Sequence, residues 1–357
     1  MPELEDVFCG LLVGTAVGDA LGLPAEGLSP RRIKRLWGGE LHHRFLWKRG
    51  MVSDDTEHTV MVCGALLAHP DDAEAFAQTL ARKLKLWLLA MPAGVGWATL
   101  RSILKLWCGV SPQRSGVVSA GNGPAMRSAV LGAFFADDSA KMEAFVRAST
   151  RLTHSDPRAQ TGALAISALT AWAVRDHTQA PPNCDQLSDL LRPLGGPEDK
   201  EWQRIVDTLV DSQTKTLTVA QFANRLGLSR TGISGYMYHT VPAAIYAWVR
   251  NYGDFRATVE SVIACGGDTD TSGAIAGALS GAVVGVDGIP REWVAGLTDW
   301  PISIRLLKRA AEQLAERKAG NKVLEPIRYL QPLLIPRNLL FLGAVLAHGF
   351  RRLLPPY

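Results

Sequence analysis

Two short acidic motifs in this chain of 357 residues contain the residue types that bind hard metal ions. The first is Ser53-Asp54-Asp55-Thr56, which stands directly before an apolar helical pattern. Its carboxylates and hydroxyls offer only oxygen ligands, which suit Mg²⁺ or Mn²⁺ rather than Zn²⁺. The same residues also fit ordinary helix capping, with a serine N-cap and acidic residues in the first turn. Capping and metal binding both remain open for this motif taken alone.

The second motif, residues 266–271, reads Gly-Gly-Asp-Thr-Asp-Thr. Its surroundings are nearly all apolar, so we expect Asp268 and Asp270 to be buried. Buried carboxylates are costly unless a cation or a partner compensates them. A simple helix-start loop is the alternative for this motif alone. Two such motifs in one chain together predict carboxylates and hydroxyls that hold two hard cations.

A third carboxylate, Glu26, closes the segment Gly-Asp-Ala-Leu-Gly-Leu-Pro-Ala-Glu at residues 18–26. Pro24 ends the preceding helical pattern, so Glu26 is expected in a loop, where it could face a cleft. A solvated loop carboxylate is the alternative. Asp19 is expected to cap a helix or to pair within the core.

Two weaker signals lie in the middle of the chain. Residues 119–127 read Ser-Ala-Gly-Asn-Gly-Pro-Ala-Met-Arg, and a Gly-Asn-Gly loop before a helix can present backbone N–H groups to a phosphate. Thr153-His154-Ser155-Asp156 begins an Ala-rich helical pattern. A lone histidine in that position is more often a cap or a surface residue than a ligand.

The segments that flank these motifs have apolar residues at helical spacing. No segment shows the sustained alternation that is typical of strands. The fold class predicted is therefore all-α, with many short helices separated by Gly, Pro, Asn and Asp. The predicted helices are Phe8–Leu23, Thr56–Leu67, Asp71–Leu89, Ala159–Val174, Tyr238–Tyr252, Phe255–Ile263 and Ser272–Val284.

Changes in composition suggest how the chain is organised. Residues 1–301 are expected to form one all-α domain, and residues 302–357 a C-terminal helical extension packed on it. Within the extension, Asn338–Phe350 is expected to be a packed terminal helix, because it is too short to span a bilayer. The polar, Pro-rich stretch Gln179–Pro197 is expected to be a linker-like surface excursion.

Composition excludes several classes of protein. The formal net charge is only +4 and no long Lys/Arg run occurs, so nucleic acid is not an expected partner. The acidic start Met-Pro-Glu-Leu-Glu-Asp is unlike a signal peptide, and no membrane partner is expected. Five scattered cysteines without a C-x-x-C pair argue against disulfides or zinc. We therefore expect a cytoplasmic protein, and a monomer.

In this order, the motifs resemble the ADP-ribosylglycohydrolase family, which includes the dinitrogenase reductase-activating glycohydrolases. The resemblance covers roughly Val7 to Val284 and is most specific in the two aspartate motifs. It implies an orthogonal all-α bundle with a binuclear metal centre, two Mg²⁺ or Mn²⁺ ions, at the bottom of a cleft.

The resemblance also implies roles for individual residues. The implied metal ligands are Ser53, Asp54, Asp55, Asp268, Asp270 and Thr271. The implied catalytic residues are Glu26, Asp55 and Asp268. The residues implied to surround the phosphates and ribose are Ser119, Gly121, Asn122, Gly123 and His154, with Tyr236 as an aromatic near the ligand.

Several positions depart from the family pattern. Ser53 replaces the usual threonine but keeps the hydroxyl. Ala120 stands where some members have an aromatic side chain. Residues 93–97, Ala-Gly-Val-Gly-Trp, replace the Asp-Ile-Gly-Asn of the dinitrogenase reductase-activating branch, and Glu57-His58 also differ from that branch.

The function implied is hydrolysis of an α-N- or α-O-glycosidic bond of ADP-ribose. The partner would be an ADP-ribosylated protein or a small ADP-ribose conjugate. Two alternatives are a hydrolase of another nucleoside or sugar conjugate and a non-catalytic ADP-ribose-binding protein on the same fold. Direct attack by water and opening of the ribose ring are both compatible with the sequence.

Overall fold

The computed structural model describes residues 3–38, 40–176, 180–321, 327 and 331–352. These residues form an all-α structure, as predicted. Strand pairing among them is limited to isolated bridges between loops.

The helices of the first half of the chain are α1 (Leu4–Gly22), α2 (Pro30–Trp37), α3 (Asp54–Ala68), α4 (Ala73–Leu89), α5 (Trp97–Trp107), α6 (Pro112–Ser115), α7 (Gly123–Met126), α8 (Ala129–Phe134) and α9 (Ser139–Arg151). Those of the second half are α10 (Pro157–Asp176), α11 (Cys184–Gly195), α12 (Lys200–Thr214), α13 (Val219–Arg225), α14 (Met237–Arg250), α15 (Phe255–Ile263), α16 (Thr269–Val284), α17 (Arg291–Gly296), α18 (Ile304–Lys318) and α19 (Leu334–Arg351). Single 3₁₀ turns cover Leu23–Ala25 and Gln331–Leu333.

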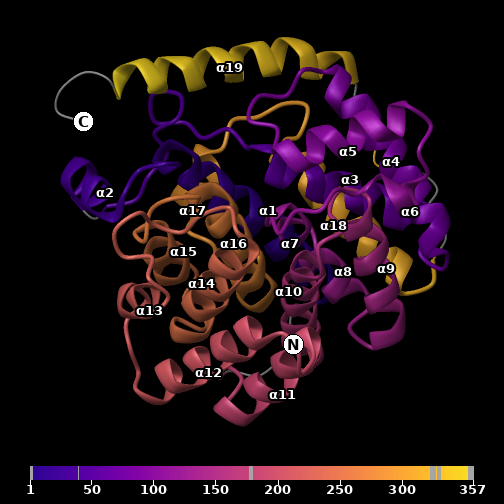
Figure 1. Cartoon of the computed structure of the whole chain (residues 1–357). Coiled ribbons are helices and arrows are strands. Elements are labelled where there is room, and N and C mark those ends of the chain that lie inside the picture. The colour runs from indigo at the N-terminus through magenta and orange to yellow at the C-terminus, as the bar shows by residue number, and fades with distance from the viewer. Residues whose placement is uncertain (1–2, 39, 177–179, 322–326, 328–330, 353–357) are drawn as a thin grey trace.

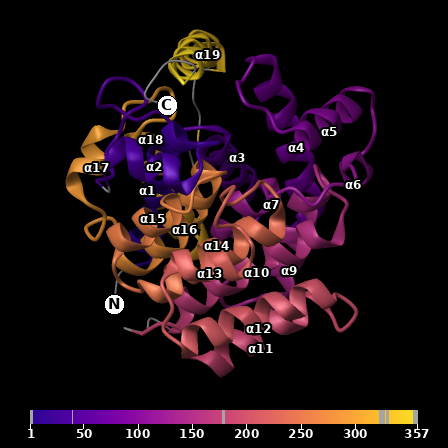
Figure 2. The same ribbon diagram turned by 60° about the vertical axis from the view of Figure 1, so that its left-hand side comes forward.

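The centre of the fold is an antiparallel pair of helices, α1 and α16, whose backbones touch (Figures 1 and 2). A Cβ atom added at Gly14 would lie 2.3 Å from the carbonyl oxygen of Gly277, and one added at Gly18 would lie 2.0 Å from that of Gly273. Only glycine permits this approach. The C-terminal end of α1 therefore meets the N-terminal end of α16, where the second acidic motif lies.

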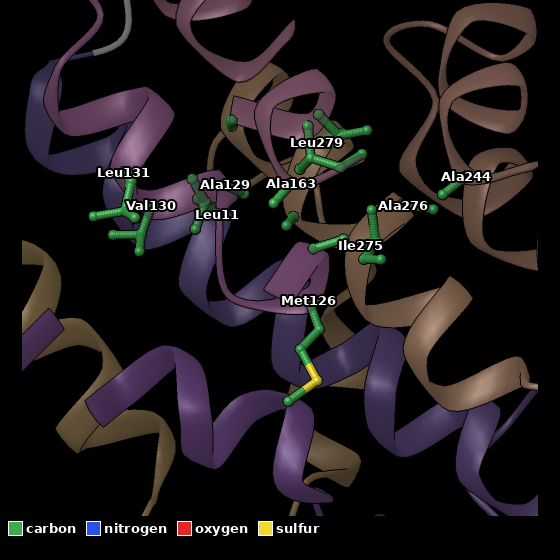
Figure 3. Packing of buried hydrophobic residues seen from close by; sticks show 14 of the residues in the cluster. Leu11, Met126, Ala129, Val130, Leu131, Ala163, Ala244, Ile275, Ala276 and Leu279 are labelled. Carbon is green, nitrogen blue, oxygen red and sulfur yellow. The ribbon is translucent and has the colours of Figure 1, made fainter. Parts of the chain in front are cut away.

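The remaining core helices pack around this pair. Figure 3 shows Leu11 of α1 and Ile275 and Leu279 of α16 in one cluster with Ala163 of α10 and Ala244 of α14. Many of the buried side chains are alanines, which lets several helices approach one another closely.

One helix among the described residues, Leu4–Ala25, is long and apolar enough to span a membrane by composition. Its most apolar stretch is completely buried in this fold. This combination of apolar composition and burial is expected of a core helix, because a helix surrounded by other helices is apolar on all sides.

The predicted helices are present with small shifts at their ends, and Phe255–Ile263 has the same bounds in the structure. The linker-like interpretation of Gln179–Pro197 was wrong from Cys184 onward, where α11 forms. A capping box between Asn183 and Gln186 starts this helix, and buried Leu187 packs one face of it. Gln179 itself lies outside the described residues.

The described part of the C-terminal segment includes the helices α18 and α19. Helix α18 packs against α1 and α3, and α19 contains the predicted helix Asn338–Phe350. The division of the chain at residue 301 stays a prediction.

Candidate metal centre and active-site cleft

The two acidic motifs meet at Asp55. The first motif begins α3 with Ser53 as its N-cap, and the second begins α16 with Asp268 in the N-cap position. Asp55 Oδ2 accepts hydrogen bonds from the hydroxyls of Ser53, at 3.0 Å, and Thr271, at 3.3 Å. Residues more than 200 positions apart are thus brought into one polar cluster.

Asp19, on α1, holds the first motif in place through hydrogen bonds. Its carboxylate accepts the backbone N–H groups of Ser53 and Thr56, and the Thr56 hydroxyl at 2.5 Å. Burial raises the pKa of Asp19 to about 7, against the lowering effect of these hydrogen bonds. Asp19 therefore caps α3 from another helix, which is one of the two roles expected from sequence.

The second motif is held in a tight loop by its glycines. Gly266 and Gly267 have positive φ angles of 69° and 85°, which glycine adopts without strain. Gly267 pairs with Leu28 on one side and with Ile233 on the other. Its N–H donates to Leu28 O at 2.8 Å, and Gly27 N–H donates to Gly267 O at 2.7 Å. This pairing fixes Glu26, the residue before Gly27, beside the second motif.

The carboxylates of the cluster raise one another's pKa values. Burial, and then neighbouring carboxylates, raise the pKa of Asp54, Asp55 and Asp270 well above the usual range. Burial and Asp268 also raise the pKa of Glu26, while Arg352 lowers it. Asp55 Oδ1 is buried without a hydrogen-bond partner. An arrangement of this kind is relieved by bound cations or by protonation.

The chemistry of the donors fits Mg²⁺ or Mn²⁺, because every predicted ligand offers oxygen. Among the described residues, no group of three or more His, Cys, Asp or Glu side chains is already gathered around a common ion position. The hydroxyls of Ser53 and Thr271, which belong to the predicted set, are hydrogen-bonded to Asp55 in this arrangement. The residues that would hold the ions are the predicted six: Ser53, Asp54, Asp55, Asp268, Asp270 and Thr271.

A cleft of about 680 Å³ opens above this cluster, a volume suited to a ligand of nucleotide size. Of the predicted residues, those that line it are Glu26, Ser53, Asp54, Asp268, Asp270, Thr271, Ser119, Gly121, Asn122, Gly123 and His154. The structure therefore brings nearly the whole predicted set into one cavity, with Asp55 buried directly beneath it.

The Gly-Asn-Gly loop is tied to the second acidic motif by its asparagine. Asn122 Nδ2 donates to Asp268 Oδ2 at 2.6 Å and to Thr240 Oγ1 at 3.0 Å. The Ser119 hydroxyl accepts the N–H of Gly121 at 3.2 Å. Helix α7, which follows, has only four residues, so its dipole is small and a phosphate here would depend on individual N–H groups.

His154 lies directly under this loop and is buried. A Cβ atom at Gly121 would lie 3.0 Å from His154 Nε2, so a larger residue here would press against the ring. Burial and the charge of Arg127 lower the pKa of His154 to about 3, which makes it a neutral hydrogen-bonding group near pH 7. Arg127 itself is fully buried and donates to Thr153 Oγ1 at 2.8 Å and bonds His58 Nδ1 at 3.1 Å.

Tyr236 does not line the cleft. Its hydroxyl donates to Glu201 at 2.8 Å, and the guanidinium of Arg158 lies over its ring. The backbone of Tyr236 does reach the site, because it pairs with Gly121 in an isolated bridge. Its aromatic contact with a ligand stays a prediction.

Sequence reasoning missed several residues that line the cleft. Leu23 and Thr99 come from the first half of the chain, and Phe341 and Val345 come from α19. No local motif marks them, because they are apolar or hydroxyl side chains brought in by the packing of distant helices.

Comparison with known proteins identifies the family of this chain. The ADP-ribosylglycohydrolase family model matches residues 1–324. A protein of Archaeoglobus fulgidus that carries no functional name is 30% identical over 308 residues, which is 83% of this chain and 93% of that protein. The ADP-ribosyl-[dinitrogen reductase] glycohydrolase of Rhodospirillum rubrum is 28% identical over 311 residues, 83% of this chain and 92% of that one.

The ADP-ribosylhydrolase ARH3 of Gallus gallus is 26% identical over 339 residues, 80% of this chain and 87% of that protein. A solved structure described as an ADP-ribosylglycohydrolase-related protein complex superposes with a TM-score of 0.64 at 24% identity, covering 89% of this chain and all of the other, and supports the fold. The chain belongs to the ADP-ribosylglycohydrolase family and is a glycosyl hydrolase of that class.

Proposed function

We propose that this enzyme hydrolyses the α-glycosidic bond between ADP-ribose and a protein side chain or a small ester, and releases ADP-ribose. We further propose that the reaction depends on two Mg²⁺ or Mn²⁺ ions and that the protein works as a cytoplasmic monomer. The names of its relatives, an ADP-ribosyl-[dinitrogen reductase] glycohydrolase and ADP-ribosylhydrolases, support the class of substrate.

The observation that carries the proposal is the meeting of three groups in one cleft. The acidic cluster around Asp55, the carboxylate of Glu26 and the Gly-Asn-Gly loop all border the same cavity or lie directly beneath it. Hard cations favour hydroxyl and phosphate oxygens, and a glycine-rich loop favours the close approach of a phosphate. An ADP-ribose unit offers both kinds of oxygen.

The ions, when bound, would supply positive charge that draws the ribose hydroxyls and a water molecule together. The six predicted ligands would hold them in place. Glu26, beside Asp268, would accept a proton from the attacking water or donate one to the leaving group. A second role that fits its position is coordination of an ion until the substrate enters.

The phosphates would lie against Gly121 and Gly123, above the ring of His154. A neutral His154 can donate one hydrogen bond without adding charge. Asn122, which bonds Asp268, would link the phosphate loop to the metal centre. Correct placement of the ribose would then depend on both the phosphate loop and the metal centre.

The direct test is the release of free ADP-ribose from arginine-, serine- and acetyl-linked substrates, with Mg²⁺, with Mn²⁺ and with excess EDTA. We expect turnover of at least one linkage, its loss in EDTA and its return when metal is restored. A melting temperature that is the same in EDTA and in Mg²⁺, with no turnover, would contradict the metal centre. ADP-ribose binding without turnover of any substrate would instead favour a non-catalytic binding protein.

A further inference from the structure

Helix α19 lies outside the segment that matches the family, which ends at residue 324. Figure 1 shows it lying across one end of the molecule, and Figure 2 shows the same helix nearly along its axis. Its buried face includes Arg337, Asn338 and Phe341, whereas most of its other positions are exposed. A helix added at the surface need not contact a catalytic site. The contacts of α19 with the cleft therefore indicate whether it takes part in the site.

The first contact is made by Arg337, which is only 2% exposed. Its guanidinium forms ion pairs with Glu57 at 2.9 Å and Asp299 at 2.7 Å, and it donates to the carbonyl oxygen of Val52. Asp299 in turn accepts the N–H of Val52 at 2.9 Å. Val52 and Glu57 stand on either side of the first acidic motif, so one side chain of α19 holds both ends of that motif.

The second contact is made by Arg352, directly after α19. It donates to the carbonyl oxygens of Glu26 at 2.8 Å and Pro24 at 3.0 Å. The loop that carries the proposed acid or base is therefore tied to the same helix as the first acidic motif.

The third contact is the cleft itself. Phe341 and Val345, one turn apart on α19, line the cavity together with Leu23 and Glu26. Phe341 is held by Phe45, with ring centroids 4.8 Å apart. Asn338, nearer the start of the helix, donates to Ala90 O at 2.8 Å, which fixes the helix to the far end of α4.

We propose that α19 is a component of the active site, with Arg337 as a positioning residue for the metal ligands and Phe341 and Val345 as an apolar wall against the ribose end of the ligand. This proposal rests on the function proposed above for the same cleft. A buried guanidinium with several charged partners has a fixed geometry, and its partners become unpaired buried charges if it is removed. Metal affinity depends strongly on such outer partners.

Binding of Mn²⁺ to the full-length protein, followed by the electron paramagnetic resonance of free Mn²⁺, tests the role of Arg337. Arg337→Lys keeps the charge but loses the fork that reaches three partners. We expect about tenfold weaker Mn²⁺ binding, and a rise in the Mg²⁺ concentration needed for half-maximal turnover. An R337K protein that melts lower but binds Mn²⁺ as tightly as the wild type would reduce Arg337 to a structural role and overturn this part.

The wall is tested on neighbouring positions of the same helix. Val345 is 37% exposed and lines the cleft, whereas Leu346 is 51% exposed and does not line it. We expect Val345→Trp to raise KM, and the Kd for ADP-ribose measured by calorimetry, about tenfold with little change in kcat, because a large side chain overfills the wall. Leu346→Trp should leave both unchanged. Equal KM and Kd values for the two variants would overturn the proposal that this face of α19 is a wall of the cleft.

Different results would contradict the proposed function and the proposed role of α19. If the wild-type protein binds ADP-ribose and Mn²⁺ but turns over no conjugate, the proposed function fails while these binding comparisons still decide the role of α19. If conjugates are hydrolysed but neither R337K nor V345W differs from wild type, the function stands and α19 is only a surface addition.

Discussion

Asn122 and Asp268, which are 146 positions apart, are joined by a hydrogen bond of 2.6 Å from the amide of one to the carboxylate of the other. The bond connects the loop suited to phosphate with the loop suited to metal. A substrate that contacts both loops would therefore meet groups whose relative position is already fixed.

Asp268→Ala and Asp270→Ala should each abolish turnover, because both carboxylates are predicted to bind metal directly. Asp156→Ala is the matched control, an aspartate near His154 whose carboxylate is paired with Arg158 at 2.7 Å. We expect only a mild loss for it. Steady-state release of ADP-ribose from the three proteins would decide the ranking, which equal losses would contradict.

Glu26→Gln should lower kcat by about 10²–10⁴-fold, the usual contribution of acid–base help, while ADP-ribose still binds within a few-fold. Gln has nearly the same shape but cannot take up or give a proton at neutral pH. Turnover and ADP-ribose binding should be measured on the same preparation. Near wild-type turnover would move the search for the base to the metal ligands themselves.

Gly14→Ala should destabilise the protein by roughly 1–3 kcal/mol, since the new methyl group would overlap the backbone of Gly277. For Gly343→Ala, in α19, no described atom beyond the helix's own nearby backbone lies within 4 Å of the new Cβ. The change should therefore be neutral or stabilise by up to about 1 kcal/mol through helix propensity. Urea unfolding of both variants gives the comparison. Similar midpoints would show that α1 and α16 are not in backbone contact.

His154 should make the folded protein less stable in acid. Its folded pKa of about 3 lies below the ordinary 6.5, so the unfolded chain takes up a proton first. Its contribution to stability is complete above pH 6.5 and is lost as the pH falls towards 3, by at most about 1.4 kcal/mol per pH unit.

The measurement for this prediction is urea unfolding between pH 7 and pH 4.5 in excess EDTA, which removes the effect of bound metal. His154→Gln should show a smaller fall in the free energy of unfolding than the wild type. Parallel curves for the two proteins would mean that His154 is not held neutral by its surroundings.

Much of the fold could be predicted because the helices differ in composition from the loops between them. The predicted helices lie close to the observed ones, and the caps of α3 and α15 lie where the helical patterns start. The amphipathic helix α11 was missed because Pro193 and its polar neighbours made the segment similar to a linker, although Asn183 and Gln186 carried a capping signal.

In the site, the motifs themselves could be found, but their supporting partners could not. Asp55 stands in a local pattern of hydroxyls and carboxylates, which is visible in the sequence. Arg337 contacts Glu57 across 280 positions, and an isolated arginine in an apolar helix gives no sign of its partner. Likewise, Phe341 and Val345 look like ordinary core residues until the helix is placed over the cleft.

The contact between α1 and α16 has a consequence for synthesis of the chain. Thr269, at the start of α16, bonds the carbonyl oxygen of Gly22 from 247 positions away, so α1 leaves the ribosome long before its partner exists. At ordinary rates of translation the interval is on the order of ten to fifty seconds. During that time an almost wholly apolar helix lacks its main packing partner, and the proposed metal centre cannot assemble until the second acidic loop has been made. Association of newly made chains with chaperones should therefore involve the first helix above all.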